Sequence, residues 1–234
     1  MKRLLSLLIL ACALANTCQA QIGESRSDLA VGVNGGYLLN TVGFNPTIKQ
    51  NFHGGTTFGL TVRYTCEKYF SCYCALQGEI NYAQMGWNEL IETSTDTYKR
   101  DINYLQIPLL ARMAFGKERG GVQGFLILGP QLGLYLSEKE YRGGEWSDYT
   151  LSLRPNHRVE QYDMKVEKKF EYGITGGLGM QVSTKSGHYF ILEGRYFYGL
   201  SDLFGNSKKD PFGKSNNGAI IAKLSYLIDI KKSK

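Results

Sequence analysis

The chain has 234 residues, enough for one domain or at most two. Its net charge is +6, and removing Lys2 and Arg3 with the export signal described below lowers this to +4, a value too small to indicate a nucleic-acid-binding protein. Sixteen tyrosines and 28 glycines against five prolines favour strands and turns over helices.

Residues 1–20 are typical of a cleaved export signal. Lys2 and Arg3 precede the apolar run LLSLLILACALA, and the segment ends on the small residue Ala20. The run is too short for a transmembrane helix, and no other stretch contains eighteen consecutive apolar residues. We therefore expect an exported mature domain over residues 21–234, which could enter a membrane only as β-strands.

Apolar and polar residues alternate with a period of two along this mature domain, as in strands with two different faces. The connections between the alternating segments are short near 67–72, 116–121 and 184–187, and long near 41–55, 88–99, 137–168 and 201–217. This pattern predicts an all-β fold: an eight-stranded antiparallel up-and-down transmembrane β-barrel with short periplasmic turns and long extracellular loops. The alternating segments are residues 28–40, 56–66, 75–87, 103–115, 122–136, 170–182, 188–200 and 219–230.

Two features of this prediction leave alternatives open. Segment 137–168 contains alternating pieces, so it could extend its flanking strands or add a hairpin and give ten strands. A soluble periplasmic barrel of the lipocalin type would show the same alternation with its apolar face inside. The membrane barrel is favoured because the apolar face is nearly free of charge and the opposite face is small and polar.

The glycine-rich stretch FEYGITGGLGMQV, residues 170–182, is interpreted as one of these strands. Alternation continues through its glycines, and no helix follows as a phosphate-binding loop would require. Gly173, Gly177 and Gly179 fall on the polar face, where a narrow barrel has little room, whereas Gly176 falls on the apolar face.

The polar face also carries charges of both signs, which we expect to pair inside the barrel because unpaired buried charges are very costly. The predicted structural charge network consists of Arg63, Glu79, Arg112, Glu193, Arg195 and Lys223.

Three cysteines remain after removal of the signal, all within CEKYFSCYC. In an oxidising compartment Cys66 could form a disulfide with Cys72 or with Cys74, leaving one thiol over. A metal site would need a fourth ligand that this stretch does not supply, so no metal is expected.

The segments NYLQIPLLARMAF, FLILGPQLGLYLS, GITGGLGMQV, ILEGRYFYGLSDLF and KLSYLIDI resemble the PorT-type family of outer-membrane β-barrels. The resemblance covers nearly the whole mature chain and implies an eight-stranded barrel in a Gram-negative outer membrane. It also implies a link to type IX protein secretion and gliding. The chain departs from the family pattern in its cysteine-containing turn, and from many barrels in its KKSK ending.

No assembled catalytic or cofactor site is evident, so the expected function is a non-enzymatic anchor or accessory component of the outer membrane. Its expected partners are outer-membrane lipid and other secretion or envelope proteins that contact the long loops, and no nucleic acid. A lipid-modifying barrel enzyme remains an alternative, with Ser152 and His157 as a conceivable hydroxyl and base. The three histidines are expected on outer loops (His53 and His157) and at a periplasmic strand start (His188).

Overall fold

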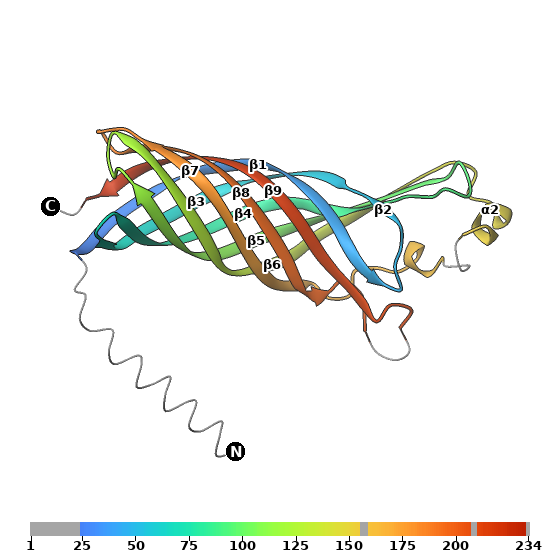
Figure 1. The fold of residues 1–234 in the computed structure, drawn as a ribbon. Coiled ribbons are helices and arrows are strands. Elements are labelled where there is room, and N and C mark those ends of the chain that lie inside the picture. The colour runs from blue at the N-terminus through green and yellow to red at the C-terminus, as the bar shows by residue number, and fades with distance from the viewer. Residues whose placement is uncertain (1–23, 155–158, 207–209, 233–234) are drawn as a thin grey trace, which may run out of the picture.

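The computed structural model describes residues 24–154, 159–206 and 210–232 (Figure 1). Its main feature is a ring of eight long antiparallel strands, with a two-residue strand β2 (Gln50–Asn51) added beside β4. Two short helical pieces, α2 (Asp148–Ser152) and η3 (Glu160–Tyr162), follow β6. The eight strands are β1 (Glu24–Asn45), β3 (His53–Tyr69), β4 (Cys72–Glu89), β5 (Thr97–Gly116), β6 (Gly121–Gly143), β7 (Phe170–Ser183), β8 (His188–Asp202) and β9 (Lys214–Lys231).

The ring is closed between its first and last strands. β1 pairs with β9 from Leu29 opposite Lys231 to Asn45 opposite Lys214, and all other neighbours along the chain pair in the same antiparallel way. Closure leaves no open edge along the barrel wall, which removes the unpaired backbone groups that lipid could not satisfy. The eight-stranded prediction is confirmed, and the described part of segment 137–168 contains no additional hairpin.

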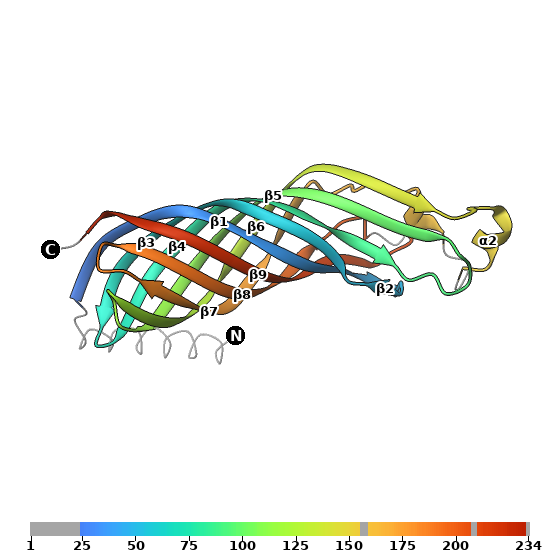
Figure 2. The ribbon, with the colours of Figure 1, turned by 90° about the horizontal axis from the view of Figure 1, so that it is seen from above.

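The two ends of the barrel differ as predicted. The short turns, the start of β1 and the end of β9 lie at one end, and the long connections lie at the other (Figure 1). Two strands are longer than the alternation indicated. β5 begins at Thr97 and β6 continues to Gly143, and both of these ends lie within segments expected to be loops. β4, β5 and β6 therefore project beyond the barrel at the long-loop end (Figures 1 and 2).

We call this projecting end the crown and define it as residues 46–52, 87–100, 138–154 and 159–169. An apolar core fills the barrel beneath it. Phe44 packs edge-on against Trp87 at 5.3 Å between ring centroids, and the rings of Phe204 and Phe212 lie within 6.2 Å of Phe44. The long-loop mouth is thus filled by side chains, as expected for a barrel of this size.

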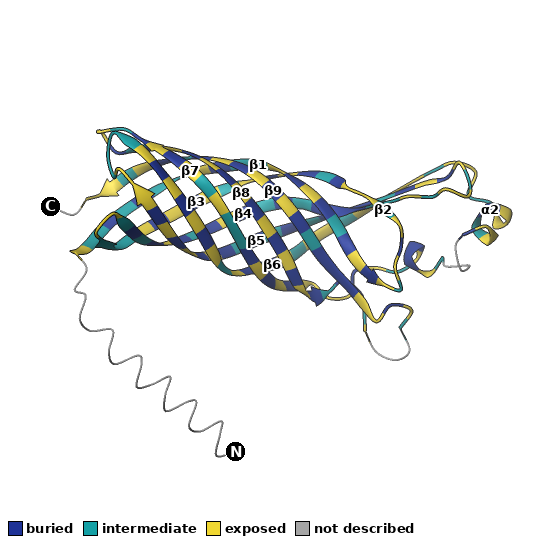
Figure 3. Ribbon diagram, in the orientation of Figure 1, coloured by how far each residue is buried: buried dark blue, intermediate teal, exposed yellow. Residues whose placement is uncertain are grey.

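Along the wall, buried and exposed residues alternate on every strand (Figure 3). The exposed positions are largely apolar, and the buried positions toward the interior combine polar and charged side chains with apolar ones. This distribution is the reverse of a soluble calyx, so the lipocalin-like alternative is wrong.

Glycines allow the interior of this narrow barrel to close. A Cβ atom on Gly179 would lie 2.5 Å from both the Leu192 carbonyl oxygen and the Phe125 ring, and one on Gly177 would lie 2.4 Å from the Gly194 carbonyl oxygen. On the outward face, a Cβ on Gly176 would meet Leu128 at an ordinary 3.4 Å. The inward glycines of residues 170–182 therefore serve close packing, and Gly176 does not.

Candidate functional site

A group of paired charges lies inside the barrel, contributed by β4, β8 and β9. Its centre is Glu79, whose carboxylate accepts hydrogen bonds from Arg195 Nη1 and Nη2 at 3.0 and 2.6 Å and from Lys223 Nζ at 2.5 Å. The amides of Gln77 and Asn81, on the same inward row of β4, donate to the same carboxylate at 2.7 and 2.8 Å. Five donated bonds thus stabilise one buried anion, the condition under which a buried ion pair is tolerated.

The other predicted members of the network lie partly in this group and partly outside it. Glu193 Oε1 accepts from Arg195 Nη2 at 2.7 Å. Arg63 and Arg112 lie nearer the short-turn end, where both donate to Gln181 Oε1 at 2.5 and 3.0 Å. All six side chains are buried in the interior, but the structure divides them into an ion-paired group of four and a separate pair of arginines.

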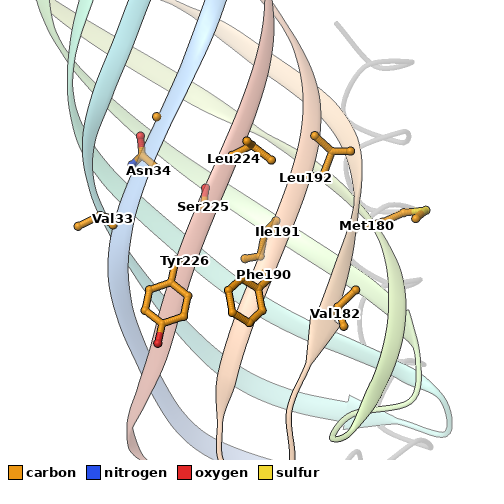
Figure 4. Close-up of a pocket in the computed structure, with 11 residues that line it drawn as sticks. Val33, Asn34, Met180, Val182, Phe190, Ile191, Leu192, Leu224, Ser225 and Tyr226 are labelled. Carbon is orange, nitrogen blue, oxygen red and sulfur yellow. The ribbon is translucent and has the colours of Figure 1, made fainter.

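The outer wall presents an almost unbroken apolar surface. Val33, Phe190, Leu192, Leu224 and Tyr226 surround a shallow groove of about 670 Å³ across β1, β7, β8 and β9 (Figure 4). An exposed apolar surface that surrounds a whole barrel has lipid as its natural solvent. Exposed aromatic side chains lie toward both ends of this surface: Tyr64, Phe115 and Phe190 in the short-turn half, and Tyr37, Phe58, Tyr172, Tyr196 and Tyr198 in the other.

In the crown, a buried ion pair ties separate loops together. Asp96 accepts hydrogen bonds from the backbone N–H groups of Glu145 and Trp146 at 3.0 and 3.2 Å, and from Arg154 Nη2 at 2.8 Å. Burial by itself raises the pKa of Asp96, but hydrogen bonds with Thr150, Trp146 and Arg154 outweigh it and lower the pKa to about 2. The carboxylate is therefore charged, and it fixes the connection after β6 to the one between β4 and β5.

The same arginine continues the network toward η3. Arg154 Nε donates to the Tyr162 hydroxyl at 3.0 Å, and that hydroxyl donates to Glu89 Oε1 at 2.8 Å. Gln161 Nε2 reaches Glu89 Oε2 at 3.3 Å. Burial raises the pKa of Glu89 despite these bonds. The crown is consequently held by side-chain contacts among three of its segments, 87–100, 138–154 and 159–169.

A cavity of about 320 Å³ opens between the crown segments 46–52, 87–100, 138–154 and 159–169. Ile48, Leu90 and Ile91 form its apolar wall, and Arg154 and Gln161 belong to its polar wall. Gln161 is buried and its Oε1 has no hydrogen-bond partner. We call this space the crown cavity. Its size and mixed lining suit a small molecule or a side chain from another protein.

The sequence matches the family model described as "outer membrane protein beta-barrel domain" over residues 19–205. The chain belongs to this family. Its fold is similar to that of the outer membrane protein OprG from Pseudomonas aeruginosa, with 12% identity, a TM-score of 0.51 and coverage of 89% of this chain and 98% of that chain.

Two further solved structures resemble the barrel at lower TM-scores. The N-terminal β-barrel domain of Pseudomonas aeruginosa OprF has 10% identity, a TM-score of 0.43 and coverage of 88% and 100% of the two chains. The outer membrane enzyme PagL has 12% identity, a TM-score of 0.40 and coverage of 86% and 98%. A comparison with curated protein sequences gives no match.

Family membership gives the barrel its orientation. In outer-membrane barrels the short turns are periplasmic and the long loops extracellular, so the crown faces outward, and the start of β1 and the end of β9 face the periplasm. The part of the chain that the structure describes contains no helix long and apolar enough to span a membrane. The expected export signal, residues 1–20, lies outside the described residues.

The three cysteines of the β3–β4 turn are not joined by a disulfide in the structure. Cys66, Cys72 and Cys74 are free thiols, and Cys66 Sγ donates to the Cys74 carbonyl oxygen at 3.3 Å. The reason is a register shift between Thr65 and Glu67, which places Glu67 rather than Cys66 opposite Cys74. The segment forms the β3–β4 turn without a covalent link.

Histidines and acids do not assemble a recognisable reactive centre in the described ranges. His53, expected on a loop, is buried at the start of β3, with Nε2 3.2 Å from Asp101 Oδ1 and Nδ1 3.0 Å from Asn88 Oδ1. Ser152 donates to the Tyr149 carbonyl oxygen, and His157 lies outside the described residues. Among the residues described, no cluster of three or more His, Cys, Asp or Glu side chains could hold a metal ion.

The structure reveals crown residues that the sequence did not single out. Arg100 is fully buried, stacks 5.1 Å above the Trp87 ring and donates to the Met164 carbonyl oxygen at 2.6 Å. It also contacts Glu140 across the β5–β6 pair. Alternation around Arg100 is interrupted, and the residue lies between the loop expected near 88–99 and the strand expected at 103–115, so no periodicity signals its burial.

Proposed function

We propose that this outer-membrane barrel is a non-enzymatic anchor that holds its crown at the cell surface for contact with other envelope proteins. The observation that carries the proposal is the buried Asp96–Arg154 pair, which cross-links the crown and leaves a preformed cavity beside it. A surface held in one shape loses little entropy when a partner binds, which is the advantage of a rigid anchor.

We further propose that the partners belong to the type IX secretion or gliding machinery. The support is the resemblance of residues 103–115, 125–137, 173–182, 191–204 and 223–230 to PorT-type barrels. The interior is filled by the charge network and by the apolar core beneath the crown, so a contribution to secretion would come from contacts with partners rather than from conduction through the barrel.

The non-enzymatic part of the proposal rests on the histidines that the structure describes. His53 Nδ1 contacts Asn88 Oδ1 and its Nε2 lies 3.2 Å from Asp101 Oδ1, so the ring nitrogens face an amide and a carboxylate rather than a hydroxyl nucleophile. His188 Nδ1 contacts the Tyr226 hydroxyl at 2.8 Å, but this pair lies on the outer wall near the periplasmic turns.

A deletion strain complemented with crown variants tests the proposed function. We expect loss of cargo export in the deletion, rescue by the unaltered protein, and no rescue by Arg154→Met. Heat-modifiable gel mobility should show that this variant still forms a barrel, because Arg154 lies outside the wall. Tyr149→Ala, an exposed crown residue away from the cavity, is the matched control and should rescue.

Unchanged cargo export in the deletion strain would contradict the secretion role. The lipid composition of the same strain separates the enzymatic alternative, because altered lipid A or phospholipid restored by complementation would contradict the non-enzymatic assignment.

A further inference from the structure

The crown cavity lies between segments that the protein itself holds in place. Ile48 belongs to the apolar core beneath the crown, and Ile91 packs against that core. The Leu90 N–H donates to the Lys49 carbonyl oxygen at 2.9 Å, which joins the segment after β1 to the segment after β4. The buried ion pair and the hydrogen bonds described above hold the other two segments. The cavity is therefore formed before any partner binds.

Charges of both signs line the crown cavity. Lys49 Nζ lies 2.5 Å from Glu92 Oε2. Arg154 Nη2 lies 2.8 Å from Asp96 Oδ2, and Arg154 also acts electrostatically on Glu89. An anion in the cavity would face Glu89, and a cation would face Lys49 and Arg154. Because a buried charge is costly unless it is paired, a lining of mixed sign favours an uncharged occupant.

One hydrogen-bond acceptor in this lining is unused. Each of the three Arg154 side-chain nitrogens already donates to a residue of the crown. Gln161 Nε2 donates to Glu89 Oε2 at 3.3 Å, which directs Oε1 of the same amide away from the carboxylate. Gln161 is 1% exposed, and of the buried side-chain nitrogen and oxygen atoms in the described lining its Oε1 alone lacks a partner. An occupant that supplies an N–H or O–H group would remove the cost of this unpaired acceptor.

The remaining wall of the cavity is apolar. It consists of Ile48, Leu90 and Ile91, and Leu90 is 38% exposed although it projects beyond the lipid-facing wall of the barrel. The volume of about 320 Å³ equals that of about ten water molecules at ~30 Å³ each. This is room for an aliphatic side chain together with the peptide group next to it. A sugar would place hydroxyl groups against the apolar wall, where they would lose hydrogen bonds to water.

We propose that the crown cavity binds an aliphatic residue of a partner polypeptide. The aliphatic side chain packs against Ile48, Leu90 and Ile91, and a backbone N–H group of the partner donates to Gln161 Oε1. The proposal rests on the proposed function, contact between the crown and other envelope proteins, and specifies the chemistry that the crown recognises. The side chain gives selectivity, because a lysine or a glutamate at the same place would meet a charge of its own sign.

Methyl NMR of the barrel in lipid nanodiscs tests the proposal with small probes. N-acetyl-leucinamide should shift the methyl signals of Ile48 and Ile91 in a saturable way. N-acetyl-lysinamide and N-acetyl-glutamine-like acidic probe N-acetyl-glutamic acid amide should give no saturable shift over the same range of concentration. N-acetyl-N-methyl-leucine dimethylamide, which has no N–H group, should bind about 2- to 12-fold more weakly than N-acetyl-leucinamide, the factor expected for one hydrogen bond.

A variant of the acceptor completes the test. Gln161→Met removes Oε1 and should weaken binding of N-acetyl-leucinamide by about 2- to 12-fold while leaving the affinity for the N-methylated probe unchanged. Lys165→Met changes an exposed crown residue outside the lining, so it is the matched control and should bind both probes as the unaltered protein does. Heat-modifiable gel mobility verifies that both variants form the barrel.

The absence of a saturable shift with N-acetyl-leucinamide would overturn the proposal, as would equal affinities for the leucine, lysine and glutamate probes. Equal affinities for the two leucine probes in the unaltered protein would refute the role of Gln161 Oε1 without recourse to a variant. Shifts produced by methyl glucoside but not by N-acetyl-leucinamide would identify a sugar site instead. Cargo export does not enter these measurements, so a failure of this proposal is distinguishable from a failure of the proposed function.

Discussion

Replacing Glu79 by glutamine tests whether one carboxylate holds the interior together. The change removes the charge that faces both Arg195 and Lys223 at 2.5 to 3.0 Å and leaves two buried cations with only Glu193 nearby. A single ion pair at about 4 Å is worth about 4 kcal/mol at an effective dielectric constant near 20. Breaking a buried pair from one side costs about 3–5 kcal/mol, which is the loss expected in the free energy of unfolding.

Glu193→Gln is the matched comparison. It removes one contact to Arg195, which keeps its two bonds to Glu79, so the expected loss is about 1.5–3 kcal/mol, the value of one hydrogen bond to a charged group. Reversible urea unfolding in lipid vesicles, followed by heat-modifiable gel mobility, measures both. Adding Lys223→Met to Glu79→Gln should recover part of the loss, because one unpaired cation is then removed. Losses in the reverse order, or no loss from Glu79→Gln, would refute the assignment of Glu79 as the centre.

Three other expectations follow from the wall and the crown. Gly179→Ala should lower the free energy of unfolding by about 1–3 kcal/mol, because its Cβ would lie 2.5 Å from neighbouring atoms. Gly176→Ala should leave that free energy unchanged when both variants are unfolded by urea in lipid vesicles. Equal effects of the two changes would contradict the inward role of Gly179. Leu224→Arg, on the outer wall, should destabilise the barrel in vesicles by about 2–4 kcal/mol if it lies at mid-bilayer, and a neutral result would mean that this surface does not face lipid. Asp96 has a folded pKa of about 2 against an ordinary 3.8, so its stabilisation of the crown is complete above pH 3.8 and is lost as the pH falls through about 2. Pepsin should therefore cut the crown increasingly over that interval and cut Asp96→Asn throughout it, and resistance unaffected by either change would show that the carboxylate does not hold the loops.

The wall of the barrel was predictable because the two-residue repeat of a strand decides whether each side chain faces lipid or the interior, whatever residue lies opposite it. The alternation in residues 170–182 and 188–200 assigned the lipid-facing and interior positions before any contact was known. The alternation of short and long connections predicted which end carries the termini. The same local rule also predicted the inward glycines, because a narrow interior limits side-chain volume at every inward position.

Pairing within the interior was not predictable in the same way. The alternation directs Arg63 and Glu79 to the same space, but the partner of each depends on its height along the barrel and on the stagger between strands. A single register shift decided that Cys66 does not face Cys74. The crown was missed for a related reason, since Asp96 and Arg154 are separated by 58 residues and lie in segments expected to be loops.

The sequence by itself thus determined where the strands lie and which two faces each strand has, and it favoured eight strands over ten and lipid over a soluble interior as the environment of the apolar face. These properties follow from a repeat of two residues that each strand carries alone. Only the tertiary structure decided that Glu79 joins two cations, that Arg63 and Arg112 both donate to Gln181, and that the crown is cross-linked around a cavity. Those features depend on distances between strands and loops far apart in the chain, and electrostatic and hydrogen-bond energies are set by those distances rather than by the order of residues.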